Sequence, residues 1–216
     1  MKNISEFIDD KVFLRVLDEY HPEEVNKLPM TEVELLKKYD DYTAPVLKYA
    51  KMFVSDGIFP LGNEVRAMFG HLADYRIKGE GKTNLEDAYG HYRRLNIDVL
   101  KIFCDEFDKF FLSELKHTYH YDFRNVRAGY LKNFAQKYFS AKKSYMSAKY
   151  KENVGNDRRS DVISPYFQAV YSYAKLYEFF KENKKGIKAA KVKAISVYAV
   201  ELIISLLGIA MSIINL

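Results

Sequence analysis

The sequence has no tryptophan, one cysteine, five prolines and ten glycines among its 216 residues. The single cysteine, Cys104, excludes a disulfide within the chain and a metal site built on paired cysteines. No stretch alternates between apolar and polar residues as a half-buried strand would, and no internal repeat or low-complexity tract is present. These absences leave an all-α protein as the fold class, with no metal and no cofactor expected.

Apolar residues recur at helical spacing in six segments, which proline, glycine and polar residues separate. Thr31 and Thr83 are each followed three residues later by a glutamate, a capping-box pattern that begins a helix. Pro45 should kink the second helix or split it in two. We expect Gly186 to be the only break before the last helix. The expected helices cover residues 4–20, 31–55, 59–77, 83–115, 121–150 and 165–180. With 18 tyrosines and 15 phenylalanines in the chain, their core should be rich in aromatic rings.

The end of the chain, residues 194–216, carries no charge apart from Glu201. A helix of this length matches the hydrocarbon core of a bilayer, about 30 Å thick. Six lysines lie between Lys181 and Lys193, and cationic residues at one end of an apolar helix hold that end in the cytoplasm. We therefore expect a cytoplasmic helical domain over 1–180, a basic juxtamembrane segment over 181–193 and one transmembrane helix over 194–216. The protein would lie at the inner membrane with most of the chain in the cytoplasm.

Polar and small residues within this apolar segment fall on one helical face, at intervals of four, three, four and three: Glu201, Ser205, Gly208, Ser212 and Asn215. Membrane helices use such stripes to pack against one another, and a carboxyl at mid-membrane needs polar surroundings. The stripe predicts a homo-oligomer in contact with lipid. A pore whose lumen contains Glu201 is the alternative.

Charge is unevenly distributed along the chain. Residues 1–115 hold 16 basic and 22 acidic side chains, whereas residues 116–151 hold nine basic and one acidic. In the basic segment, lysines alternate with tyrosines and Phe139, a composition that suits single-stranded nucleic acid. It equally suits a helix that docks its rings on the core and turns its lysines to the acidic half or to anionic lipid. The candidate RNA- or lipid-binding residues are Lys132, Lys137, Lys142 and Lys143.

The candidate active site lies in the helical hairpin on either side of residue 80. Arg66 and His71 form an R-x4-H pair, and an antiparallel hairpin would set Arg66 roughly opposite Arg94 and His71 roughly opposite Tyr89 to His91. Histidine can take up or release a proton near neutral pH and arginine can hold a phosphate, so these residues suit RNA cleavage without a metal. Residues five apart on a helix lie about 140° apart around its axis, so a second helix or a second subunit must complete the site. Glu64, His91 and Arg94 are the supporting residues.

The double pattern NEVRAMFGHLADY, a short loop and NLEDAYGHYRRLNIDVLK resembles bacterial HEPN-like proteins over about residues 59–111. That resemblance implies an all-helical, often dimeric protein and metal-independent endoribonuclease activity, with Arg66 and His71 lining a dimer cleft. Ala67 stands where active members usually carry a polar residue, and some HEPN-like domains are scaffolds only.

The layout of a HEPN-like domain on a membrane helix is similar to that of the small accessory membrane proteins of RNA-targeting CRISPR systems, which assemble into membrane rings. This similarity implies antiviral defence, with RNA or an RNA-guided effector protein as the partner. Three functions remain open: a membrane-anchored ribonuclease, an oligomer that permeabilises the membrane, and a helical adaptor that recruits a partner to the membrane.

Overall fold

The computed structural model describes residues 10–53, 59–78, 82–118, 129–154 and 161–214. Within these ranges the side chains of residues 10, 52–53, 59, 78, 82, 115–118, 191, 194–195, 197 and 205–214 are not described. Every regular element in the described part is a helix, which confirms the all-α class. The elements are α2 (Asp10–Asp18), α3 (Pro22–Asn26), α4 (Glu32–Lys38), the π-helical turn η1 (Tyr39–Thr43), α5 (Ala44–Phe53), α6 (Phe59–Lys78), α7 (Lys82–Thr118), α8 (Tyr130–Val154), α9 (Ile163–Glu182) and α10 (Lys184–Ile214).

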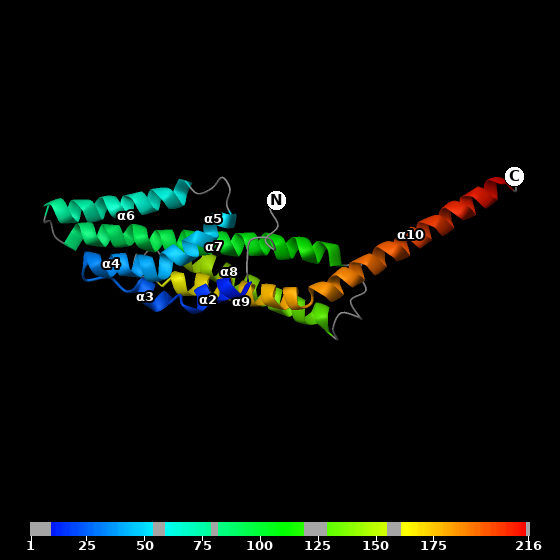
Figure 1. Ribbon diagram of the computed structural model, residues 1–216, viewed down its shortest axis with the longest axis horizontal. Coiled ribbons are helices and arrows are strands. Elements are labelled where there is room, and N and C mark those ends of the chain that lie inside the picture. The colour runs from blue at the N-terminus through cyan, green and yellow to red at the C-terminus, as the bar shows by residue number, and fades with distance from the viewer. Residues whose placement is uncertain (1–9, 54–58, 79–81, 119–128, 155–160, 215–216) are drawn as a thin grey trace.

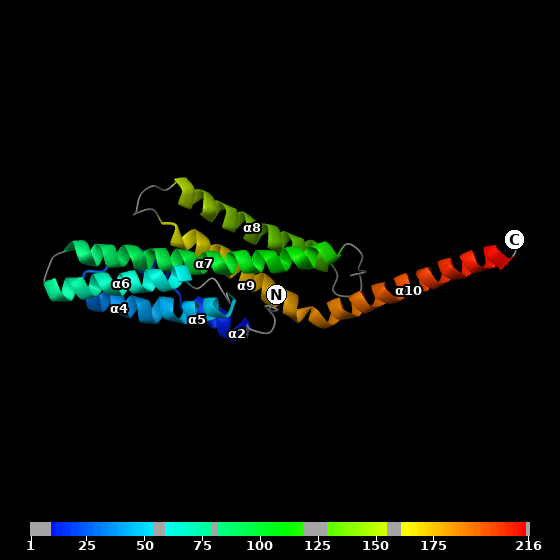
Figure 2. The ribbon, with the colours of Figure 1, turned by 90° about the horizontal axis from the view of Figure 1, so that it is seen from above.

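The long helix α7 runs the length of the bundle, and the other helices pack around it (Figure 1). Helix α6 lies antiparallel against α7, while α8 and α9 pack against each other on the opposite side of α7 (Figure 1). In Figure 2 α8 lies to one side of α7 and α9 crosses beneath it. The short helices α2 to α5, from the N-terminal part of the chain, pack on α7 and α9. This arrangement leaves α6 in contact chiefly with α7, so the outer side of α6 faces solvent.

The core is built from aromatic rings, as the composition predicts. Phe107, in the second half of α7, is fully buried, and its ring centroid lies within 6.2 Å of the centroids of Phe13, Phe111, Tyr173 and Tyr177. These residues come from α2, α7 and α9, so one ring cluster joins segments far apart in the sequence. Cys104 is buried in the same core, and its burial raises the pKa of its thiol.

The expected helix over residues 31–55 begins as predicted and is split before its proline. Thr31 Oγ1 accepts a hydrogen bond from the Glu34 amide at 3.2 Å, and the Glu34 carboxylate accepts one from the Met30 amide at 2.9 Å. In η1 the Ala44 amide donates to the carbonyl of Tyr39, five residues earlier. Since Pro45 has no N–H to continue the α-helical ladder, the wider turn lies directly before it.

The last helix differs from the expectation in two respects. Gly186 does not break it; the break falls at Asn183, whose side chain donates to the carbonyl of Phe179 at 2.8 Å and ends α9. Ile187 and Ala190 are buried, so the first turns of α10 pack on the bundle, although they belong to the segment expected as a basic connector. Beyond them α10 extends away from the bundle as a single helix (Figure 1).

Among the described residues, no helix combines the length and the apolar character that crossing a membrane requires. The transmembrane helix expected over 194–216 is therefore not found in the described part. Side chains from Ser205 onward, about half of that segment, lie outside it.

Candidate functional site

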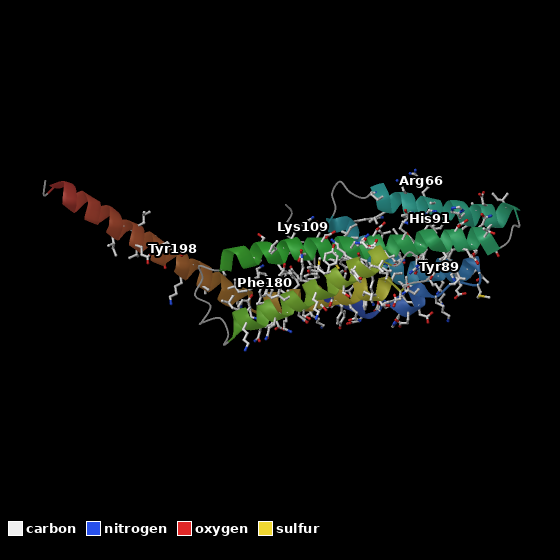
Figure 3. The ribbon with its side chains drawn as sticks, turned by 180° about the vertical axis from the view of Figure 1, so that it is seen from behind. Arg66, Tyr89, His91, Lys109, Phe180 and Tyr198 are labelled. Carbon is white, nitrogen blue, oxygen red and sulfur yellow. The ribbon has the colours of Figure 1, made fainter. Side chains whose placement is uncertain are left out.

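The hairpin of α6 and α7 brings charged and titratable side chains from both helices together on its surface. The two helices pack antiparallel, as the short connection between them predicts. Glu64 and His71 come from α6, and His91 and Arg94 from α7; we call these four residues the hairpin cluster. Figure 3 shows His91 between the two helices.

Glu64 contacts two other residues of the hairpin cluster. Its Oε2 lies 2.7 Å from His91 Nδ1, and its Oε1 lies 3.4 Å from Arg94 Nη1. The Glu64 side chain is 15% exposed and that of His91 is 27% exposed, so the contact is partly shielded from water. A carboxylate that accepts from Nδ1–H fixes the tautomer of a neutral imidazole and leaves Nε2 as its proton acceptor. Glu64 therefore fixes the orientation of the His91 ring.

The second histidine stacks on the first. The ring centroids of His71 and His91 lie 5.3 Å apart with an interplanar angle of 18°. The expected position of His71 is opposite the segment from Tyr89 to His91, and the structure places its ring against His91, at the end of that segment. Two imidazoles and one guanidinium thus share one patch of surface, an arrangement suited to proton transfer near an anionic group.

Arg66 does not join the hairpin cluster within one chain. It is exposed, makes no hydrogen bond or ion pair with another residue in the described part of the chain, and lies on the side of α6 away from α7 (Figure 3). The five-residue spacing explains this, because Arg66 and His71 lie about 140° apart around the helix axis. A contact between Arg66 and the cluster would have to come from a second molecule.

Asp98 is a neighbour that the sequence reasoning missed. It follows Arg94 by four residues and His91 by seven on α7, so helical spacing alone places it on the same face. Burial raises the pKa of the Asp98 carboxyl, while the nearby cation of Lys101 opposes this rise. In the described part of the chain no group of three or more potential ligands is placed to hold a metal ion.

The four candidate lysines of α8 have different surroundings. Lys142 forms an ion pair with Asp108, and Lys137 lies over the ring of Phe179 with Nζ 5.7 Å from its centroid. Lys132 and Lys143 are exposed and make no ion pair within the described residues. The helix therefore docks part of its charge on the acidic half, as one interpretation of the sequence holds, and presents the rest to solvent.

Of the residues on the expected transmembrane stripe, the structure describes only one side chain. Glu201 is exposed on the part of α10 that extends from the bundle. The side chains of Ser205, Gly208 and Ser212 lie outside the described residues.

No known family model matches the chain, and no curated protein or solved structure shows significant similarity to it. The resemblance to HEPN-like proteins therefore rests on the residues of the hairpin alone and stays a prediction.

Proposed function

We propose that this protein is a membrane-anchored, oligomeric HEPN-like effector that cleaves RNA at the hairpin cluster. The observation that carries the proposal is the His91 imidazole, held by Glu64 and stacked on His71 beside Arg94. The setting in antiviral defence, with or without an RNA-guided partner protein, follows from the resemblance in sequence and layout only.

The residues of the hairpin cluster can divide the chemistry of RNA cleavage among them. Nε2 of His91 accepts the proton of the 2′-hydroxyl, and the 2′-oxygen forms a bond to phosphorus. The bond from phosphorus to the 5′-oxygen breaks, and His71 in its protonated form gives that oxygen a proton. Arg94 holds the phosphate oxygens as charge develops on them. The products are a 2′,3′-cyclic phosphate and a free 5′-hydroxyl, and no metal enters the step.

A second copy of the chain supplies what one copy lacks. Arg66 is turned away from the cluster of its own chain. In the proposed oligomer it contacts substrate bound by a neighbouring subunit. This is the physical reason to propose an oligomer for the catalytic unit, independent of the stripe on α10.

Replacing either histidine of the hairpin cluster should abolish most of the RNA cleavage. We expect His71→Ala and His91→Ala to lower the cleavage rate at least about a hundredfold, the usual contribution of a proton-transfer group. Glu64→Gln should lower it through the orientation of His91. The measurement is cleavage of labelled single-stranded RNA by the full-length chain.

His21→Ala is the matched control, because Arg15 and His21 form a similar pair, with five residues between them, and lie elsewhere, in α2 and directly before α3. It should cleave at the wild-type rate. Equal rates in all four variants, or no cleavage by the wild type, would exclude the hairpin cluster as a nuclease.

Permeabilisation of the membrane is the second candidate function, favoured by α10. Val200, Leu202, Ile203 and Ile204 are between 55% and 63% exposed, and residues this close in sequence point to different sides of a helix. An apolar surface on several sides of a projecting helix is typical of segments covered by lipid or by other helices.

Deleting residues 194–216, or the substitution Glu201→Leu, should abolish depolarisation if this second function operates. Membrane potential is measured with a dye in cells expressing each variant, with total RNA analysed in parallel. Depolarisation with intact RNA would make α10 the effector and remove the nuclease proposal. An adaptor would show neither depolarisation nor cleavage.

A further inference from the structure

Helix α8 has two sides of different character. Its inner side packs Tyr130, Phe134, Tyr138 and Tyr145 into the core, each 4% exposed or less. Its outer side carries large apolar side chains in solvent: Phe139 is 63% exposed, Met146 54% and Tyr150 68%. Such exposure of aromatic rings has an energetic cost unless a partner covers them.

The lysines of α8 divide in the same way. On the inner side, Lys149 lies 3.5 Å from Asp105, and Lys142 is paired with Asp108. On the outer side, Lys132 and Lys143 have no such partner among the described residues. The positive charge of the outer side is therefore not compensated within the described part of the molecule.

The one carboxylate of α8 does not alter this balance. Glu152 is engaged on the inner side by Lys101 Nζ at 2.6 Å and by the Tyr166 hydroxyl at 2.5 Å. The other exposed polar groups on or at the edge of the outer side are those of Gln136, Ser140, Ser147 and Lys151, and none of them is acidic. We call the stripe formed by Lys132, Phe139, Lys143, Met146 and Tyr150 the outer face of α8.

These residues share one face because of their spacing. Intervals of seven, four, three and four residues follow the turns of an α-helix, so the side chains form a row along its axis. Phe139 and Tyr150 are eleven residues apart, which corresponds to about 16 Å along the helix. The row thus contains two rings and two cations, and its two rings are separated by a length that a few nucleotides can span.

We propose that the outer face of α8 binds single-stranded nucleic acid, with bases stacked on Phe139 and Tyr150 and phosphates at Lys132 and Lys143. Exposed rings accept any base by stacking, and uncompensated lysines attract the backbone. The choice of RNA over DNA as the strand rests on the proposed function. The binding itself does not, because α6 and α8 lie on opposite sides of α7 (Figure 2).

Two other occupants fit the geometry less well. A second copy using the same face would bring lysines against lysines, which repel each other. A membrane that holds α10 would contact the end of the bundle from which α10 departs. Helix α8 begins near that end, where Tyr130 stacks on Phe179 of α9, but it runs along the side of the bundle and its other end points away from α10 (Figure 2).

Binding is measured by fluorescence anisotropy, with a labelled, unstructured single-stranded RNA and the full-length chain in a neutral detergent. Phe139→Ala/Tyr150→Ala should weaken binding at least about fivefold for each ring removed. Phe139→Leu/Tyr150→Leu should weaken it to a similar extent, because leucine keeps the apolar surface and loses the stacking face. Binding kept by the leucine variant and lost by the alanine variant would overturn the stacking proposal.

The lysines are tested by salt dependence. Lys132→Gln/Lys143→Gln should lower the affinity and reduce the slope of log affinity against log salt by about 1.4, the value for two single-strand phosphate contacts. Lys37→Gln/Lys48→Gln, a pair of exposed lysines on α4 and α5, is the matched control and should bind like the wild type. An equal loss in both pairs would indicate attraction by net charge only and overturn a defined site.

Two further readouts separate this inference from its competitors and from the proposed function. If the Phe139→Ala/Tyr150→Ala variant loses binding to anionic phospholipid vesicles but keeps RNA binding, the face belongs to lipid. If, without RNA, the variant has a lower molecular mass than the wild type, the face belongs to a second copy. The His71→Ala/His91→Ala variant should bind RNA normally and not cleave it. RNA that the wild type binds but does not cleave would remove the nuclease proposal and leave the outer face of α8 in place.

Discussion

Raising the pH from 9 to 12 is expected to unfold the helical bundle in one steep transition. Burial raises the pKa of many tyrosine hydroxyls in the core, to about 12 for Tyr89 and Tyr138. The same direction holds for Tyr20, Tyr92, Tyr130, Tyr145, Tyr166 and Tyr173. A tyrosine in the unfolded chain ionises near pH 10. Above that pH the folded state holds more protons than the unfolded state, so stability is complete below pH 10 and is lost as the pH rises toward the folded pKa values.

The size of the effect follows from the number of tyrosines. Each one costs about 1.4 kcal/mol of stability for every pH unit above 10, as long as it stays protonated in the folded state. Several such groups together exceed the stability of an ordinary domain, about 5–15 kcal/mol. Far-ultraviolet circular dichroism and tyrosinate absorbance, followed together, should change in the same narrow range of pH.

Tyr150 is the control for this transition, because it is 68% exposed. Tyr150→Phe should unfold at the same pH as the wild type. Tyrosines that all ionise near pH 10 while the helical signal persists would show that the core hydroxyls are accessible to water.

Local signals in the sequence predict most of the helices. The cap at Thr31 and the start of α6 at Phe59 depend on neighbours within a few residues, and a single sequence contains that information. The hairpin of α6 and α7 is predictable for the same reason, since its short loop forces the helices to be antiparallel. His71 opposite His91 then follows from counting residues along the two helices.

Contacts between helices distant in sequence could not be predicted in this way. Asn96 is 1% exposed and accepts hydrogen bonds at 3.0 Å from the hydroxyls of Tyr20 and Thr43, which precede it by 76 and 53 residues. Helical periodicity assigns a residue to a face but does not identify the residue opposite it on another element. The partners of Glu64 could not be predicted for the same reason. Glu64 lies two residues before Arg66 in the sequence, but its carboxylate contacts His91 and Arg94.

The polarised charge of the sequence has a structural counterpart at Asp108. This carboxylate of α7 accepts hydrogen bonds from the hydroxyls of Tyr138 at 3.0 Å and Tyr173 at 2.9 Å, and it pairs with Lys142. Both tyrosines are buried and come from α8 and α9. One acidic side chain therefore joins three helices and orients the basic helix α8 on the acidic half.

Asp108→Ala is expected to lower the free energy of unfolding by about 3–5 kcal/mol, because it leaves two buried hydroxyls without an acceptor and a lysine without its counter-charge. Denaturant unfolding of the full-length chain measures the change. Glu106→Ala is the matched control: Glu106 lies two residues away on α7 and, among the residues that the structure describes, pairs only with Lys109, at 2.6 Å on the surface, so its loss should cost less than about 1 kcal/mol.

A rescue variant decides whether the hydroxyls are the cause. Adding Tyr138→Phe and Tyr173→Phe to Asp108→Leu removes the orphaned donors together with their acceptor, and replacing both partners of a buried hydrogen bond by apolar groups can be nearly neutral. The triple variant should therefore be more stable than Asp108→Leu alone. If it is less stable, the two hydroxyls have other acceptors once Asp108 is gone, and the attachment of α8 depends on its rings and not on this carboxylate.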